Sequence, residues 1–179
     1  MTALITLDAV KAYLGLGAVP NASQDALLVA LIERASAAIE NYCQRKLTLE
    51  ARTEWRNGNN SNCMILRDAP IQSVEAVSID GQSTPVEAIS LVGRTIRLTN
   101  LVFRSGISNV RVDYTAGFEA IPADMQQACI ETVALMFRRR DHLDVSSKAL
   151  AGETINYIVD ELTPSARRIL SNYRIVAAF

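Results

Sequence analysis

The stretch VRVDYTAGFEAIPADMQQACIETVALMFRRR, Val110 to Arg140, decides how the rest of the chain is interpreted. Val110 to Phe118 is typical of the last of several short strands and ends in a Thr-Ala-Gly turn. A helix is predicted from Ile121 to Arg140, because Pro122 suits the first helical position, where its missing N–H is not needed. The sequence therefore predicts a strand that passes almost directly into a helix.

This predicted helix is apolar over a wide arc, so it should be covered on more than one side. The cover can come from the strands and another helix of the same chain, or from a neighbouring subunit, and the sequence leaves both open. The apolar positions are Met125, Ala128, Cys129, Ile130, Thr132, Val133, Leu135, Met136 and Phe137.

Two further helices are predicted in the N-terminal third. A short helix over residues 6–14 has Thr6 as its N-cap. A longer helix can be capped by Ser23 and extends to about Arg45, with apolar residues at helical spacing. These are Leu27, Leu28, Leu31, Ile32, Ala35, Ile39, Tyr42 and Cys43.

From Lys46 the pattern changes to that of short strands. Asn57 to Asn62 is predicted to be a turn or mobile hairpin tip, and Asp80-Gly81 a tight hairpin turn. Several short strands in one region favour a small antiparallel sheet or a barrel-like sandwich. The predicted strands are residues 47–55, 63–66, 74–79, 89–91, 95–98 and 110–114.

The C-terminal part is predicted to begin with a polar loop, 141–152, followed by a β-like segment, 152–162. A last helix covers Thr163 to Arg174, with Thr163-Pro164 as N-cap and first position. The fold class is therefore predicted as α+β, mainly helical: a bundle of about four helices with an inserted small antiparallel β subdomain. We expect one domain over 1–179, divided into 1–46, 47–118 and 119–179.

Composition narrows the class of protein. The chain has 179 residues, 49% of them apolar, and a net charge of −1, so no general positive field draws it onto DNA. Three cysteines without a CxxC pair favour reduced thiols. The longest apolar run is far shorter than a bilayer span, and no signal peptide is recognisable. We expect a soluble protein made in a reducing cytoplasm.

No pattern of catalytic or metal-binding residues stands out. His142 with Asp141 and Asp144 is too small a set for a metal site, and no G-x-S-x-G motif supports a nucleophilic serine. Gly15 to Gly17 lacks the strand and the lysine of a nucleotide loop and is expected to end a helix. We predict no catalytic residue, no cofactor and no metal.

The only dense basic run is Arg138, Arg139 and Arg140, at the end of a predicted helix, where cations offset the helix dipole. Its alternative role is a subunit–subunit ion pair or a contact with DNA phosphates. Arg167 and Arg168 in the last helix pose the same question, and the sequence leaves both roles open.

Four segments, in this order, resemble the head–tail connector (adaptor, head-completion) proteins of long-tailed double-stranded-DNA bacteriophages. They are ITLDAVKAYL with SQDALLVALIERASAAIENYCQRKL at the N-terminus, APIQSVEAVSIDG, VRVDYTAGFEAIPADMQQA, and AGETINYIVDELTPSARRILSNYR. The resemblance covers nearly the whole chain. The long β region with its Asn57–Asn62 loop departs from the family pattern and suggests an additional partner surface.

This resemblance implies a structural protein of the virion neck, not an enzyme. It implies a ring of identical subunits, expected as a dodecamer, that docks beneath the portal protein after DNA packaging. The ring would extend the channel for double-stranded DNA, without sequence specificity, and provide the attachment surface for the next neck or tail-completion protein. No membrane or small-molecule partner is expected.

Candidate subunit or portal contacts are the five arginines and an apolar end. We hypothesise that Ile175, Val176 and Phe179 belong to a segment that adds a strand or plug to the portal or to a neighbour. Alternative functions are a neck or tail-completion protein, a nucleic-acid-binding module that uses Arg138 to Arg140, and a small enzyme with a cryptic site.

Overall fold

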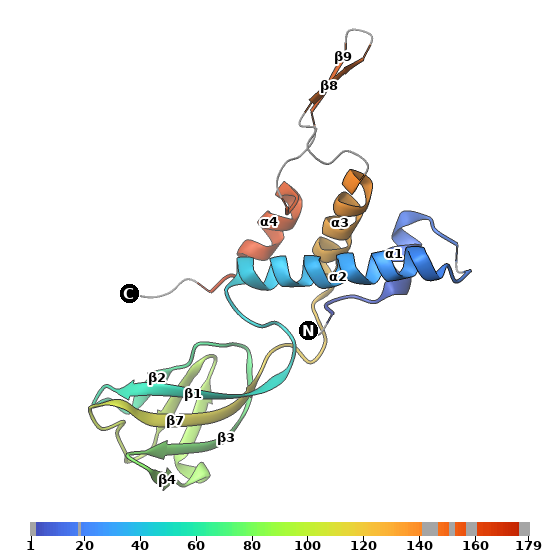
Figure 1. Cartoon of the computed structure of the whole chain (residues 1–179). Coiled ribbons are helices and arrows are strands. Elements are labelled where there is room, and N and C mark those ends of the chain that lie inside the picture. The colour runs from blue at the N-terminus through green and yellow to red at the C-terminus, as the bar shows by residue number, and fades with distance from the viewer. Residues whose placement is uncertain (1–2, 18, 141–146, 151–152, 157–160, 176–179) are drawn as a thin grey trace. The chain divides into compact units, whose positions relative to one another are not determined.

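The chain forms two compact units in a computed structural model (Figure 1). The helical unit comprises Met1–Arg45 and Ile121–Phe179, and the β unit comprises Lys46–Ala120. The β unit is therefore inserted between two sequence-distant parts of the helical unit. The prediction of a single domain over 1–179 stays a prediction. The structure describes residues 3–17, 19–140, 147–150, 153–156 and 161–175.

The helical unit is organised around α3 (Ala123–Arg139), which packs against α1 (Leu7–Leu14), α2 (Ala22–Cys43) and α4 (Pro164–Ser171). In Figure 1, α3 and α4 lie side by side with α2 running across them. These three helices provide the wide cover that the apolar arc of α3 requires. The buried side chains include Val10, Leu28, Ile32, Ala35, Ile39, Cys43, Met125, Ala128, Cys129, Val133, Ala166 and Leu170.

Two helix starts agree with the predicted caps. The Thr6 hydroxyl accepts a hydrogen bond from the N–H of Ala9 at 3.3 Å. The Thr163 hydroxyl accepts one from the N–H of Ala166 at 3.0 Å, with Pro164 at the first helical position. Each hydroxyl satisfies an N–H that the helix itself cannot pair.

Three helix boundaries differ from prediction. The N-cap of α2 is Asn21, not Ser23, because the Asn21 amide oxygen accepts the N–H of Gln24 at 3.2 Å. Pro122 is the N-cap of α3, with an extended ψ of 141°, so α3 begins at Ala123, one residue after the predicted first helical position. The last helix ends at Ser171, ahead of the predicted end at Arg174.

Two of the three cysteines are buried in the helical unit as reduced thiols. Burial raises the pKa of the Cys43 thiol to about 11 and that of Cys129 to about 12. Both groups therefore remain protonated near neutral pH and pack as small apolar side chains, as the sequence predicts.

The larger sheet of the β unit has the strand order β1-β7-β3-β4 and is antiparallel throughout. Its strands are β1 (Glu50–Gly58), β7 (Gly106–Ala116), β3 (Ile71–Ile79) and β4 (Gln82–Thr84). The turn between β3 and β4 is Asp80-Gly81, as predicted, and both residues have positive φ. The central strands β3 and β7 begin at Ile71 and Gly106, ahead of the predicted starts at residues 74 and 110. Residues before the apolar alternation still form backbone pairs with the neighbouring strands.

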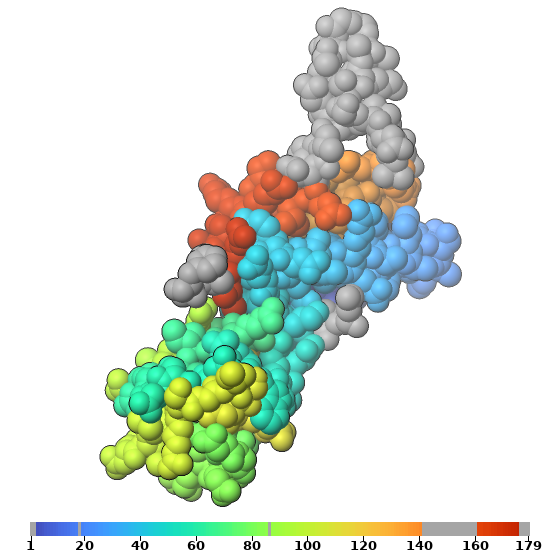
Figure 2. Space-filling model, turned by 60° about the vertical axis from the view of Figure 1, so that its left-hand side comes forward, coloured from blue at the N-terminus to red at the C-terminus, as the bar shows by residue number. Residues whose placement is uncertain are grey.

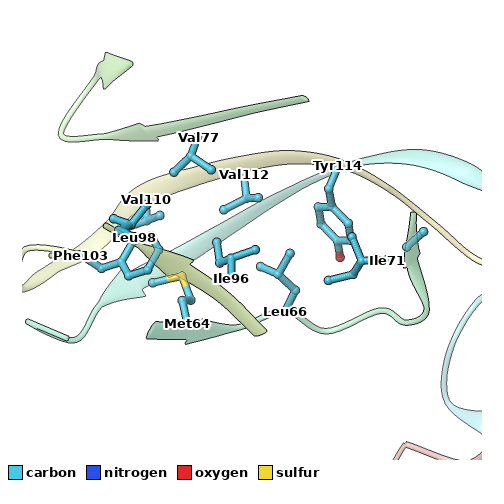
Figure 3. Close-up of a cluster of buried hydrophobic side chains, with 11 residues drawn as sticks. Met64, Leu66, Ile71, Val77, Ile96, Leu98, Phe103, Val110, Val112 and Tyr114 are labelled. Atoms are coloured by element: carbon cyan, nitrogen blue, oxygen red, sulfur yellow. The ribbon is translucent and has the colours of Figure 1, made fainter. Parts of the chain in front are cut away.

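The smaller sheet has the order β2-β6-β5, formed by β2 (Cys63–Ile65), β6 (Thr95–Leu98) and β5 (Ile89–Val92). A short 3-10 helix, η1 (Val86–Ala88), precedes β5. The two antiparallel sheets share one apolar core, shown in Figure 3, which agrees with the sandwich of the two predicted alternatives. The core residues are Met64, Leu66, Ile71, Val77, Ile96, Leu98, Phe103, Val110, Val112, Tyr114 and Ala116.

Side chains bridge the gap between the edge strands β1 and β2. The Glu54 carboxylate accepts hydrogen bonds from the Tyr114 hydroxyl at 2.8 Å and from the N–H of Arg67 at 3.1 Å. Arg56 donates to the carbonyl of Ile65 at 3.0 Å. Burial, followed by the hydrogen bond with Glu54, raises the pKa of Tyr114. The contacts to the Ile65 carbonyl and to the Arg67 N–H satisfy backbone groups at the edge of the smaller sheet that a further strand would otherwise pair.

Between α3 and α4 the chain carries a hairpin of β8 (Ser147–Leu150) and β9 (Glu153–Asn156). β8 lies in the segment predicted as a polar loop, so that prediction is wrong for these four residues. The α+β class is confirmed. The description "mainly helical" is not, because among the described residues nearly as many lie in strands as in helices.

The predicted Thr-Ala-Gly turn brings the two ends of the β unit together. Gly117 has φ of +122°, and a Cβ there would lie 2.2 Å from the carbonyl oxygen of Thr48. Its N–H donates to the carbonyl of Pro70 at 2.9 Å, and the N–H of Phe118 donates to that of Leu47 at 2.8 Å. The chain therefore enters and leaves the β unit at adjacent points, which only glycine at position 117 permits.

Gly117→Ala should destabilise the protein by about 3 kcal/mol or more, because a Cβ adds both a disfavoured φ and an overlap with backbone. Gly81→Ala is the matched control: its φ is +79°, but no atom lies within 4 Å of the added Cβ. It should cost only about 1 kcal/mol. Urea unfolding followed by circular dichroism measures both, and equal losses would contradict the close-approach argument.

Candidate interaction surfaces

The Arg138–Arg140 run lies at the C-terminal end of α3. Arg138 and Arg140 are exposed and Arg139 is half-buried. The Arg140 guanidinium lies over the Phe137 ring, 4.3 Å from its centroid, which holds this cation against the helix by a cation–π interaction. The position suits the helix dipole, and the exposed guanidinium of Arg138 also offers a charged contact to a partner.

A second pair of arginines lies on α4. Arg167 and Arg168 are both exposed, and the backbone carbonyl of Arg167 accepts a hydrogen bond from the Tyr42 hydroxyl at 3.4 Å. Before α4, Glu161 forms an ion pair with Arg34 of α2 at 3.0 Å, with both side chains 62% exposed. Such an exposed pair contributes little to stability. Arg34 and Glu161 can therefore exchange this ion pair for other charged partners in an assembly.

The Tyr173-Arg174 pair after α4 joins three helices. The Tyr173 hydroxyl lies 2.8 and 2.9 Å from the two carboxylate oxygens of Asp124, in the first turn of α3. The Arg174 guanidinium lies 5.6 Å from the centroid of the Tyr42 ring on α2. Burial and the hydrogen bond with Asp124 raise the pKa of Tyr173. We call Tyr42, Asp124, Tyr173 and Arg174 the helix latch.

The latch was not predicted from the sequence. Tyr173 and Asp124 are 49 residues apart, and no periodic pattern connects positions so distant. The one sequence feature that points to the latch is the Tyr-Arg pair at the end of the closing segment that resembles the family. The resemblance assigns no role to this pair. In the structure this pair fastens the end of α4 to the beginning of α3.

Ile175 follows the latch and its N–H donates to the carbonyl of Cys43 at 3.1 Å, at the end of α2. This position is near the N-terminal end of α3, whereas Arg138–Arg140 lie at its other end, about 25 Å away for a helix of 17 residues. The structure therefore does not bring Ile175 together with that run. Val176 and Phe179 lie outside the described residues.

The β unit has two open hollows beside its Asn-rich turn. One, of about 630 Å³, is lined by Trp55, Ile65 and Thr95 among others. The second, of about 820 Å³, lies between the segments 60–62 and 100–104. Neither is lined by a cluster of acids and bases that would suggest catalysis.

Within the described ranges, no group of three or more His, Cys, Asp or Glu side chains is placed to bind a metal ion. Asp141, His142 and Asp144 lie outside those ranges, so the prediction about them is not tested. Among the same described residues, no helix is long and apolar enough to cross a membrane.

A model of the head completion protein family matches residues 3–176. No curated protein matches the chain. Among solved structures, a chain in the neck of an empty gene transfer agent (GTA) particle, computed with C6 symmetry, has a TM-score of 0.66 and 21% identity and covers 100% of this chain and 95% of its own.

Two other similar chains come from native particles of this kind. One, in a native gene transfer agent virion, has a TM-score of 0.64 and 20% identity, covering 98% of this chain and 92% of its own. The other, in a native neck computed with C12 symmetry, has a TM-score of 0.60 and 19% identity, covering 87% and 85%. At these identities the likeness concerns the fold.

Tyr173→Phe should lower the free energy of unfolding by about 1–2 kcal/mol at neutral pH, because it removes a hydrogen bond to a carboxylate. The raised pKa means that the neutral hydroxyl is favoured in the folded state. This contribution is therefore complete below the ordinary tyrosine pKa of about 10 and is lost as pH rises through the higher folded value.

The measurement is urea unfolding of both proteins from pH 7 upward. The gap between wild type and Tyr173→Phe should narrow at alkaline pH. Tyr13→Phe is the control, since Tyr13 is 48% exposed and has no hydrogen-bonded partner among the described residues. A gap that is absent at pH 7, or as large for Tyr13→Phe, would exclude the latch.

Proposed function

The chain belongs to the head completion protein family and is a structural protein of the head–tail joint, where we propose that it forms a ring beneath the portal. The observation that carries this proposal is the family match over residues 3–176, which spans every helix and strand of both units. The likeness to chains of particle necks agrees with it at the level of fold.

A closed ring of identical subunits needs two different surfaces that fit each other. The helical unit offers two such surfaces. Its α1–α2 side exposes apolar side chains, among them Val19 at 80% and Val29 at 44% exposed. Its α3–α4 side carries the exposed Arg138, Arg167 and Arg168. Figure 2 shows α2, α3 and α4 forming one continuous surface of this unit.

We place the ring contact on these helices, with the apolar residues of α1 and α2 meeting a neighbour's α3–α4 side. Burying exposed apolar side chains supplies the main favourable free energy. The arginines, including Arg139 and Arg140, then form ion pairs across the subunit or portal interface, or face the phosphates of passing DNA. One similar neck was computed with C12 symmetry and another with C6 symmetry, and we propose twelve subunits for this ring.

The partners follow from this position in the particle. The ring would contact the portal on one side and the next neck or tail-completion protein on the other. A net charge of −1 suits a channel wall past which DNA must move without binding tightly. None of these steps breaks or forms a covalent bond, so we propose no catalytic role and no cofactor. A tail-completion protein would share these properties, and portal binding distinguishes the two.

The ring contact is tested by Val29→Asp, which places a carboxylate in the proposed apolar interface. Val29 lies on the exposed side of α2, so the monomer should fold normally. Mixed with the portal of the same genome and imaged by electron microscopy, wild type should form rings and the variant should not, because a buried unpaired charge is strongly unfavourable. Val92→Asp, at a position 72% exposed on the β unit, is the control.

Rings formed by Val29→Asp but lost in Val92→Asp would move the subunit contact to the β unit. Loss in both variants would also contradict the proposed interface.

The segment after the latch is proposed to attach to the portal or to a neighbouring subunit. The hydrogen bond from the N–H of Ile175 to the carbonyl of Cys43 ties the last described residue of the chain to the end of α2. A chain shortened to end at Arg174 keeps the latch and lacks Val176 and Phe179. We expect the shortened chain to retain wild-type thermal stability within a few degrees. It should bind the portal at least about tenfold more weakly in a pull-down titration. Unchanged portal binding and ring assembly would remove this role.

A further inference from the structure

The larger hollow of the β unit lies between two loops at one end of the sandwich. We call it the amide hollow; it is lined by Asn60, Ser61, Asn62, Asn100, Leu101, Val102 and Arg104 and has a volume of about 820 Å³. Four of these seven residues carry an amide or hydroxyl, and Arg104 is the single charged one.

The backbone around the amide hollow is held by specific contacts. The N–H of Asn60 donates to the carbonyl of Phe103 at 2.7 Å, and the N–H of Phe103 donates to that of Ser61 at 2.8 Å. The Phe103 side chain between these bonds is fully buried. A Cβ at Gly58 would lie 1.6 Å from the Arg104 carbonyl oxygen, so glycine there allows the loops to approach. The amide hollow is thus preformed.

Asparagines outside the hollow use their amides to fix these loops. Asn109 accepts from the N–H of Gly58 at 2.9 Å and donates to the Arg104 carbonyl at 2.9 Å. Asn57 accepts from the N–H of Ser108 at 2.7 Å. Asn59 donates to a backbone carbonyl at 3.1 Å and accepts a backbone N–H at 3.0 Å. The side-chain amides of Asn57, Asn59 and Asn109 are therefore used to hold the loops in place.

The asparagines that line the amide hollow make far fewer side-chain hydrogen bonds. Asn60 and Asn100 have no side-chain hydrogen bond to any described residue, and the Asn62 amide only accepts from the Cys63 thiol at 3.3 Å. Asn60 and Asn100 both adopt positive φ, 56° and 59°. Three preformed amides thus retain the paired donor and acceptor groups that a peptide backbone requires.

Arg104 differs from three other arginines of the β unit in having no carboxylate of a described residue beside it. Arg52, Arg56 and Arg111 each lie within 3.4 Å of a carboxylate. Arg104 is exposed and has no acidic partner among the described residues. Beside it, Leu101 and Val102 are 43% and 42% exposed. The hollow therefore presents one uncompensated cation next to an apolar pair.

We infer that the amide hollow binds an extended peptide segment of another virion protein, in which a carboxylate lies next to an apolar side chain. The amides of Asn60, Asn62 and Asn100 pair with the peptide backbone, Arg104 pairs with the carboxylate, and Leu101 with Val102 covers the apolar side chain. A single arginine is too little charge for a nucleic-acid site. That the partner is a virion protein rests on the proposed function.

The probe is a set of overlapping synthetic peptides covering the portal, neck and tail proteins of the same genome, titrated into the full-length isotope-labelled chain. An acidic peptide should shift the side-chain amide NMR signals of Asn60 and Asn100. Arg104→Glu should weaken its affinity at least about tenfold. Arg67→Glu is the matched control, because Arg67 is also exposed and lies outside the hollow.

Three results would overturn the inference: no peptide shifts these signals, the binding peptide does not depend on Arg104, or a short DNA duplex shifts them instead. The ring assay separates this inference from the proposed function. Arg104→Glu should still form rings with the portal, because the substitution leaves the helical unit unchanged. Failure of wild type to form rings would reject the proposed function alone.

Discussion

The return of the chain at Gly117 is the constraint on which the structure depends. The helical unit is assembled from two segments separated by the whole β unit, so its core forms only if the chain comes back to where it left. The close approach of Gly117 to Thr48 and the pairing of Phe118 with Leu47 secure this return. Once the ends of the β unit are joined, its internal length adds little to the entropy cost of completing the helical core. α3 then follows directly and becomes the helix that contacts the other three.

The same arrangement explains how one chain can serve as a joint. The core residues of α3 are used within the chain, and the helix latch fixes the end of α4 to its first turn. What remains outside are an apolar α1–α2 side and an arginine-bearing α3–α4 side, which differ from each other as a heterologous ring requires. The β unit has its own core and its own hollow, so a second partner can bind there without repacking the helices.

Much of this fold could be predicted, because local patterns determine it. The spacing of Leu28, Ile32 and Ile39 predicts α2 as a helix, and Asp80-Gly81 predicts the hairpin turn between β3 and β4. The errors concern residues for which local rules allow two answers: Asn21 and Ser23 are both good caps, and Pro122 suits either side of a helix start. Ser147–Leu150, which forms β8, is predicted as a loop because it shows no apolar–polar alternation. The latch and the amide hollow depend on contacts between distant residues, and the interface roles of Arg138 and Arg168 depend on partners outside the chain.

The central claim, that this chain completes the head–tail joint, is tested most directly by electron microscopy of a lysate in which its gene is disrupted. The account predicts DNA-filled or leaking heads without tails, together with free tails of normal length, and restoration of whole particles when the wild-type gene is supplied. Normal tailed particles from the disrupted gene would contradict it.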